Sequence, residues 1–175
     1  MKVRLLFMII MVSLLSNLIF AFDNTEINES NWLNHPKIVE VREIYNEVEA
    51  EIRYKNVIEQ KKIFEYSEPY APTLKVIYFN KFNIVRKYTE EAGSDDSALE
   101  FNYYYDHKQI LRFVFIKGGT VNGSILEHRI YFDSNGKKIW EIQKYIEGPG
   151  YTFPEVWPES ELVFDPWKAF TEKND

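Results

Sequence analysis

Residues 131–141, YFDSNGKKIWE, contain the pattern that decides the fold. Two aromatic residues precede Asp133, a turn with Asn135-Gly136 follows, and a second apolar run starts at Ile139. Asn-Gly between two apolar runs is the strongest short-range signal for a β-hairpin, because both residues tolerate the positive φ that a tight turn requires. The stretch therefore predicts a strand, a turn and a second strand.

The same pattern occurs twice earlier in the chain. Residues 78–86, YFNKFNIVR, and residues 104–112, YYDHKQILR, each place Asn or Asp between an aromatic pair and an apolar run. Asn80 and Asp106 are 26 residues apart, and Asp106 and Asp133 are 27 residues apart. Asn and Asp suit such turns because their side chains accept hydrogen bonds from nearby backbone amides. The repeat predicts three hairpins and an antiparallel meander of about six strands.

A helix is predicted before the hairpins. Apolar residues within 38–52 recur at steps of three and four, which traces one helical face. Asn34 or His35 would cap this helix, and Pro36 would lie in its first turn. The periodic pattern continues to about residue 59, and its acidic residues are expected to pair with nearby basic residues on the solvated side.

The chain closes with a different composition. Residues 147–158, EGPGYTFPEVWP, are rich in Gly, Pro and aromatic residues, and Asp165-Pro166 predicts the start of a short helix. We therefore predict an α+β fold: a long N-terminal helix packed on an antiparallel β-meander of about six strands (three hairpins), with an aromatic and Pro-rich C-terminal segment.

Residues 1–21 have the three parts of a secretory signal peptide. A basic start precedes an apolar run over residues 5–15, and Ala21 is a small residue before a polar stretch. The prediction is an exported protein, periplasmic or secreted. An uncleaved N-terminal anchor is the alternative, because Ile19 is large where a small residue is preferred and the segment is just long enough to span a bilayer.

The composition of the chain after the signal narrows its partners. We expect a flexible lead-in over residues 22–34 and a single domain over residues 35–175. Removing Lys2 and Arg4 with the signal leaves 19 basic and 27 acidic residues, a net charge of −8. This balance argues against nucleic acid and anionic membranes as partners. Zero cysteines exclude disulfides and thiolate metal sites. We predict no cofactor and no integral membrane span after cleavage.

Two surfaces are candidates for binding. Alternation along the strands would collect acidic, amide, Arg and Tyr side chains on one polar sheet face, and the C-terminal aromatic loop is the second surface. Tyr gives contact area with a polar tip, so such surfaces can bind a protein or carbohydrate of the envelope or exterior. An ordinary solvated sheet face is the structural alternative. The candidate binding residues are Tyr104, Arg129, Tyr131, Glu141, Tyr145, Tyr151 and Trp157.

His128 is the candidate catalytic residue. Strand alternation places it on the apolar side with Leu126 and Ile130, as either a buried general base or a core histidine. No Ser or Cys occupies a nucleophile motif. The residue supports an alternative function, an envelope hydrolase that uses His128 with Glu127 or with acids of the 93–97 loop.

Asp95 and Asp96 are the candidate metal ligands, because carboxylates bind hard cations such as Ca²⁺. The spacing of a known calcium loop is absent, and a solvated turn is the structural alternative. The main prediction is a non-catalytic binding or inhibitor-type module that acts through the polar and aromatic sheet face. A structural or assembly protein that pairs through exposed strand edges is the further alternative.

Overall fold

The computed structural model describes residues 25–67 and 70–173. The chain divides into two compact units, residues 1–40 and 41–175. The predicted signal peptide, residues 1–21, lies outside the described residues. Among the residues that are described, no helix combines the length and the apolar character needed to cross a membrane.

The first unit includes a short 3₁₀ helix, η1 (Trp32–Asn34), and the start of helix α2 (Pro36–Arg53). The predicted cap is confirmed at His35. Its carbonyl accepts from two amides of the first turn of α2, and its ring Nδ1 lies 3.3 Å from the Lys37 amide that donates to it. Pro36 fits the first turn because no helical partner is needed for the amide that proline lacks.

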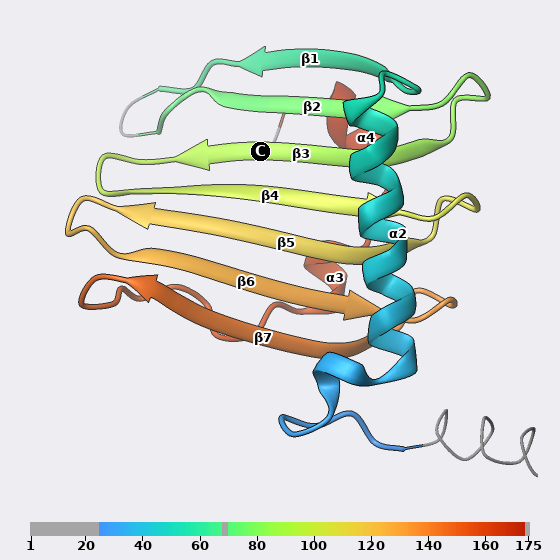
Figure 1. The fold of residues 1–175 in the computed structure, drawn as a ribbon. Coiled ribbons are helices and arrows are strands. Elements are labelled where there is room, and N and C mark those ends of the chain that lie inside the picture. The colour runs from blue at the N-terminus through green and yellow to red at the C-terminus, as the bar shows by residue number, and fades with distance from the viewer. Residues whose placement is uncertain (1–24, 68–69, 174–175) are drawn as a thin grey trace, which may run out of the picture. The chain divides into compact units, whose positions relative to one another are not determined.

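The second unit contains one antiparallel sheet whose seven strands follow each other in chain order (Figure 1). Because each strand pairs with its sequence neighbours, the topology is an uninterrupted meander. The strands are β1 (Ile58–Phe64), β2 (Thr73–Phe79), β3 (Val85–Gly93), β4 (Ser97–Tyr105), β5 (Leu111–Thr120), β6 (Ile125–Phe132) and β7 (Lys138–Glu147).

The predicted fold class, α+β with a long N-terminal helix on about six strands, is wrong. Strands take up 41% of the described residues and helices 21%, and the longest helix, α2, has 18 residues. Helix α2 ends at Arg53 because Lys55 adopts a left-handed φ of 58°. Residues 58–64 form a strand, β1, that adds to the six predicted strands. The start of this segment continues the helical spacing of apolar residues.

The three predicted hairpins are confirmed, and their turns share one construction. The side chains of Asn80, Asp106 and Asp133 each accept two backbone amides of the following turn, at 2.8–3.1 Å. The residue three positions after each of them has a positive φ: Asn83, Gln109 and Gly136. The 26- and 27-residue spacing therefore marks a true structural repeat.

Each hairpin also carries a β-bulge just after its turn. The strand pairing skips the residue six positions after the Asn or Asp, which is Arg86, Arg112 or Ile139. Both arginines are buried and donate to a carbonyl of the next hairpin: Arg86 Nη1 to Tyr105 at 2.9 Å, and Arg112 Nε to Phe132 at 3.3 Å. The repeat thus includes a hydrogen bond that joins one hairpin to the next.

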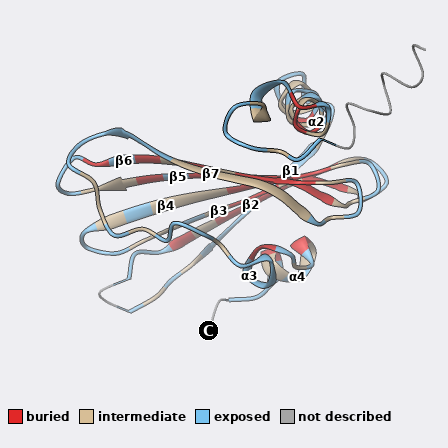
Figure 2. Cartoon of the chain, turned by 90° about the horizontal axis from the view of Figure 1, so that it is seen from below, coloured by how far each residue is buried: buried red, intermediate tan, exposed pale blue. Residues whose placement is uncertain are grey.

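The two faces of this sheet have different covers (Figure 2). Residues 41–53 of α2 lie on one face, and the C-terminal segment with α3 (Glu159–Leu162) and α4 (Pro166–Thr171) lies on the other. The hydrophobic core fills the second face, where strand side chains pack with Leu162 and Phe170. The core strands contribute, among others, Ile77, Tyr103, Val114, Ile116, Ile130 and Phe132.

Polar contacts stabilise both ends of α4, and the contact at its C-terminal end ties it to the sheet. The Asp165 side chain accepts from two amides of the first turn, which confirms the predicted cap. At the other end, the fully buried Lys75 Nζ donates to the carbonyls of Ala169 and Glu172 at 2.9 and 2.8 Å. A cation at a helix C-terminus satisfies carbonyls that lack helical partners.

Candidate binding site

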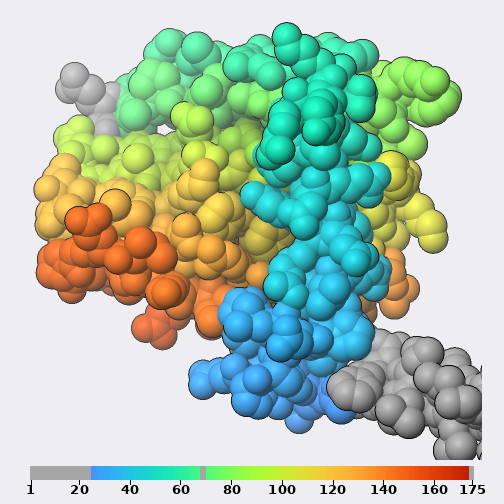
Figure 3. All heavy atoms as spheres, in the orientation of Figure 1, coloured from blue at the N-terminus to red at the C-terminus, as the bar shows by residue number. Residues whose placement is uncertain are grey.

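A cavity of about 250 Å³ lies between residues 41–46 of α2 and the strands β5 and β6. Two of its lining residues are arginines, four are aromatic, and none of the eight is acidic. Figure 3 shows that α2 covers only part of this face of the sheet. The cavity is lined by Val41, Arg42, Tyr45, Asn46, Phe113, Phe115, Arg129 and Tyr131.

Strand register brings the sheet side of the cavity together. Phe113 pairs with Tyr131, and Phe115 pairs with Arg129, across β5 and β6. Directly opposite residues of an antiparallel pair lie on one face, so these four side chains point toward α2. From the helix, Tyr45 completes the wall because its ring lies 5.7 Å from that of Phe113.

The aromatic rings form a connected wall. The Phe113 ring centroid lies 4.9 Å from that of Tyr131 and 6.2 Å from that of Phe115. Tyr104 lies behind this wall, with its ring 5.0 Å from Tyr45 and its hydroxyl donating to Glu49 at 2.9 Å. The rings therefore hold one another in place around the cavity.

Arg129 is fixed from two sides. Its guanidinium lies 5.2 Å above the Phe115 ring, and its Nη2 pairs with the Glu127 carboxylate. Burial raises the pKa of Tyr131, while the positive charges of Arg129 and Arg42 lower it by a smaller amount. The Tyr131 hydroxyl is therefore neutral at physiological pH, and both guanidiniums act on it.

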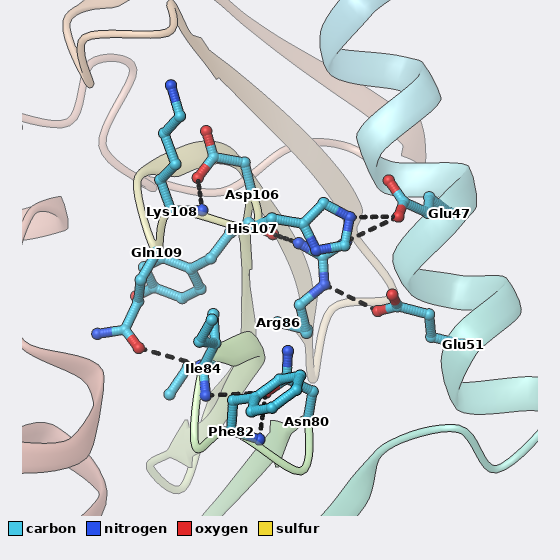
Figure 4. A network of polar contacts seen from close by, with 12 residues as sticks. Glu47, Glu51, Asn80, Phe82, Ile84, Arg86, Asp106, His107, Lys108 and Gln109 are labelled. Atoms are coloured by element: carbon cyan, nitrogen blue, oxygen red, sulfur yellow. Dashed lines mark hydrogen bonds and ion pairs between the residues drawn. The ribbon is translucent and has the colours of Figure 1, made fainter.

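A second polar cluster lies where α2 passes the β2–β3 and β4–β5 turns (Figure 4). Oxygen and nitrogen atoms of Glu47, Glu51 and His107 lie within 4.8 Å of one another, the spacing of a metal ligand set. The buried Arg86 occupies the cluster instead: its Nε lies 2.8 Å from Glu51 and its Nη2 3.3 Å from Glu47. A metal ion would have to displace this guanidinium, so the cluster is an ion-pair network.

The predicted single polar face is not formed. Tyr131 pairs with Trp140, so Glu141 lies opposite Ile130, on the face away from α2. Tyr145 shares that side, opposite Leu126. Of the seven candidate binding residues, the cavity includes Arg129 and Tyr131, and Tyr104 supports its wall.

The other four candidates hold the C-terminal segment to the sheet. The Trp157 amide donates to Glu141 at 2.8 Å, the Tyr145 hydroxyl donates to the Tyr151 carbonyl, and the Tyr151 hydroxyl donates to Asp96. The Trp157 ring packs edge-on against Phe101, 5.3 Å between centroids. These four residues therefore make intramolecular contacts that attach the C-terminal segment to the sheet.

His128 is sealed in the core. Its side chain has no exposed surface, and its Nε2 lies 2.8 Å from Glu141, which also pairs with Lys138 Nζ at 2.6 Å. Burial lowers the pKa of His128, and the Lys138 charge lowers it further against the opposing effect of Glu141. Glu127 lies on the opposite face, so the acid beside His128 is Glu141 and not the predicted Glu127, and the buried ring is not exposed to a substrate.

Asp95 and Asp96 do not converge on a metal site. The Asp96 carboxylate accepts from the hydroxyls of Ser94, Ser97 and Tyr151, and the Tyr151 bond is the main reason that the pKa of Asp96 is lowered. Within the described residues, the metal-capable grouping includes neither aspartate. The structural alternative, a solvated turn, fits these contacts.

Six of the eight cavity residues were not predicted as site residues: Val41, Arg42, Tyr45, Asn46, Phe113 and Phe115. Arg42 follows Val41 on a helix whose polar residues were assigned to solvent, and Tyr45 was counted as part of an apolar face. Phe113 and Phe115 alternate along β5, and this alternation is the signal that would have placed them beside Arg129. No protein-family model, curated protein or solved structure matches this chain.

Proposed function

We propose that the protein is a non-catalytic binding module whose cavity between α2 and strands β5 and β6 binds an anionic ligand. One observation supports this: Arg42 and Arg129 line the same small, ring-walled cavity, which has no acidic lining residue. The full chain has a net charge of −6, so the two arginines around this cavity form a local positive patch on an acidic protein. Apolar walls with a few placed polar groups are typical of ligand sites.

Arginine gives this site its preference for anions. The guanidinium is planar, always charged, and presents paired N–H donors that match the oxygens of a carboxylate or phosphate. Aromatic walls exclude water and strengthen such contacts. No nucleophile or accessible general base is needed for this function, which is binding alone.

The binding proposal is tested by an NMR screen of the ¹⁵N-labelled protein against one-ring acids, amides and amines. We expect acids to shift the amide resonances of Phe113, Phe115 and Arg129. A double variant, Arg42→Gln with Arg129→Gln, should lose these shifts. Lys117→Gln is the matched control, because Lys117 also lies over the Phe115 ring, at 5.5 Å, but does not line the cavity.

The result that contradicts the binding proposal is a screen in which no compound shifts resonances of the cavity. Shifts that survive the double arginine variant would also contradict it, because they would show that the arginines are not used.

We also propose that residues 1–21 direct export and are removed. The support is the sequence of that segment, with a basic start, an apolar run and Ala21. Expression of the full chain in a secretion-competent bacterium, followed by mass spectrometry of the exported product, should give a chain that starts at Phe22. A product that retains residues 1–21 in the membrane fraction would favour the uncleaved anchor.

Assembly through a strand edge is a second candidate function. Within the described residues β1 pairs with β2 alone, and six of its seven residues are exposed. A second copy placed around a two-fold axis at Gln60 would put Glu59 opposite Lys61 in both directions. Light scattering should then detect a dimer that Gln60→Pro abolishes, since proline cannot join a strand ladder. A strict monomer would exclude this candidate.

A further inference from the structure

We infer that the ligand of the cavity is a small aromatic carboxylate, with one ring and one negative charge. This inference rests on the proposed function and specifies its ligand. It follows from the charge, the walls and the size of the cavity, which point to the same class of compound.

The charge of the site fits a singly charged anion. Arg129 already pairs with Glu127, so part of its charge is balanced within the protein. A carboxylate brings one negative charge and two oxygens in a plane, which matches the fork of a guanidinium. A phosphate brings up to two negative charges and a tetrahedral shape, so the charge of Arg129 that Glu127 already balances in part offsets it less well.

The walls fit a ring. Phe113, Phe115 and Tyr131 present adjacent ring surfaces on the sheet, and Tyr45 faces them from α2 with an interplanar angle of 84° to Phe113. Aromatic pairs prefer offset or edge-to-face contact, and such pairs are stabilised beyond the burial of their area. Phe113 and Tyr131 are buried, so a flat aromatic ligand gains such contacts from the half-buried rings of Tyr45 and Phe115, whereas a saturated ring does not.

The size fits a single-ring compound. The cavity volume of about 250 Å³ is below the range of roughly 300–1,000 Å³ that is usual for drug-sized ligands. It corresponds to about eight water molecules at roughly 30 Å³ each. A benzene ring with a short acid side chain fills this space, and a sugar chain or a folded protein segment does not.

Neutral donors complete the site. Burial raises the pKa of Tyr45, and the same effect dominates at Tyr131, so both hydroxyls keep their protons at physiological pH. Asn46 adds an amide from the next position of α2. These groups can donate hydrogen bonds to a carboxylate oxygen without adding charge, and the two arginines supply the preference for an anion over a cation of the same shape.

Isothermal titration calorimetry with phenylacetate tests the inference. We expect saturable binding of phenylacetate, and at least about tenfold weaker binding of phenylacetamide, which has the same ring without the charge. Cyclohexylacetate, which keeps the charge without the aromatic ring, should bind more weakly than phenylacetate. Inorganic phosphate should bind more weakly still. A fifth compound, acetyl-glycyl-phenylalanine with a free carboxylate, distinguishes a free small molecule from the C-terminus of a peptide.

Variants then connect the binding to the cavity. Arg129→Gln and, separately, Arg42→Gln should each weaken phenylacetate binding by about tenfold or more, as expected for loss of a charge-assisted hydrogen bond. Lys117→Gln should bind like the parent protein. If Arg129→Gln does not fold, Arg42→Gln and the loss of affinity at raised ionic strength still test the role of charge.

The outcomes separate the inference from the proposed function. Equal affinity for phenylacetate and phenylacetamide, with shifts at Phe115 and Arg129, would overturn the ligand class and leave cavity binding intact. Tight binding of phosphate would overturn it in the same way. Absence of binding by every compound, with no shift at the cavity, would overturn both.

Discussion

The two faces of the sheet differ in how much ion pairing adds to apolar packing, since α2 also buries Val41 and Val48. On the α2 side, ion pairs join helix to strands: Lys87 Nζ lies 2.9 Å from Glu49, and Arg86 pairs with Glu51 and Glu47. On the C-terminal side, buried aromatic and aliphatic side chains pack with Leu162 and Phe170, and His128 with Glu141 is a buried polar exception.

Because of this difference, we expect one face of the sheet to determine stability and the other to determine binding. A close-packed apolar face gains most of the hydrophobic free energy and leaves no room for a ligand. A face held by directional ion pairs can leave a gap between its elements, and the 250 Å³ cavity occupies that gap. We therefore expect substitutions on the C-terminal side to act on folding, and those around the cavity to act mainly on binding.

The largest expected effect is on the free energy of unfolding, when one Phe is truncated on each face of the sheet. Phe132→Ala removes a fully buried ring from the core and should lower the free energy of unfolding by about 3–5 kcal/mol. Phe115→Ala, at a half-buried ring of the cavity, should cost roughly half as much because less surface is lost from burial. Urea unfolding followed by circular dichroism measures both. Equal costs would show that the two faces do not differ.

The next largest effect tests the ion pairs of the α2 side. Arg86→Met leaves the Tyr105 carbonyl and two glutamates without their buried partner, and should cost about 3 kcal/mol in unfolding free energy. Lys61→Met is the control, since Lys61 and Glu59 form an exposed pair. A change at Arg86 as small as that at Lys61 would mean that the pair adds nothing to stability.

The buried histidine should make the C-terminal side sensitive to acid. Because burial lowers the pKa of His128, the unfolded chain takes up a proton first as the pH falls below about 6.5. Stability is thus present above that pH and is lost on acidification, by at most about 1.4 kcal/mol per pH unit. His128→Gln should remove this slope between pH 7.5 and 5 in thermal unfolding. Identical slopes in both proteins would refute the assignment.

The smallest effect compares two neighbouring tyrosines on opposite faces. Tyr104→Phe removes the hydrogen bond to Glu49 and should cost about 1 kcal/mol. The buried Tyr105 hydroxyl has no hydrogen-bond partner within the described residues, so Tyr105→Phe should be neutral or stabilise by up to about 1 kcal/mol. Thermal melts of both variants measure the difference. Destabilisation by Tyr105→Phe would reveal a bound partner, such as water.

Local signals predicted the hairpins correctly and the sheet incompletely. Asn80, Asp106 and Asp133 determine their turns through contacts within five residues, so the sequence suffices there. Strand β1 was missed because Val57 and Ile58 continue the helical spacing of apolar residues. Its strand conformation depends on pairing with β2, which is a long-range contact that periodicity does not detect.

The candidate site was only partly predictable for a related reason. Which face a side chain takes depends on the register of its strand, and each bulge changes that register by one residue. In β7 the bulge at Ile139 places Trp140 opposite Tyr131 and sends Glu141 to the other face. Arg129 and Tyr131 were predicted together because they alternate along one strand. Assigning Arg42 to the site requires knowing where the helix packs on the sheet.

The bulge arginines also relate to the order of the hairpins. Arg86 and Arg112 each donate a hydrogen bond to a carbonyl of the next hairpin, so each of these two units is tied to the hairpin that follows it. The last unit has Ile139 at this position and makes no such bond. The three units thus supply six of the seven strands, β1 lying outside the repeat, and in this chain the bulge arginine is present in the two hairpins that another hairpin follows.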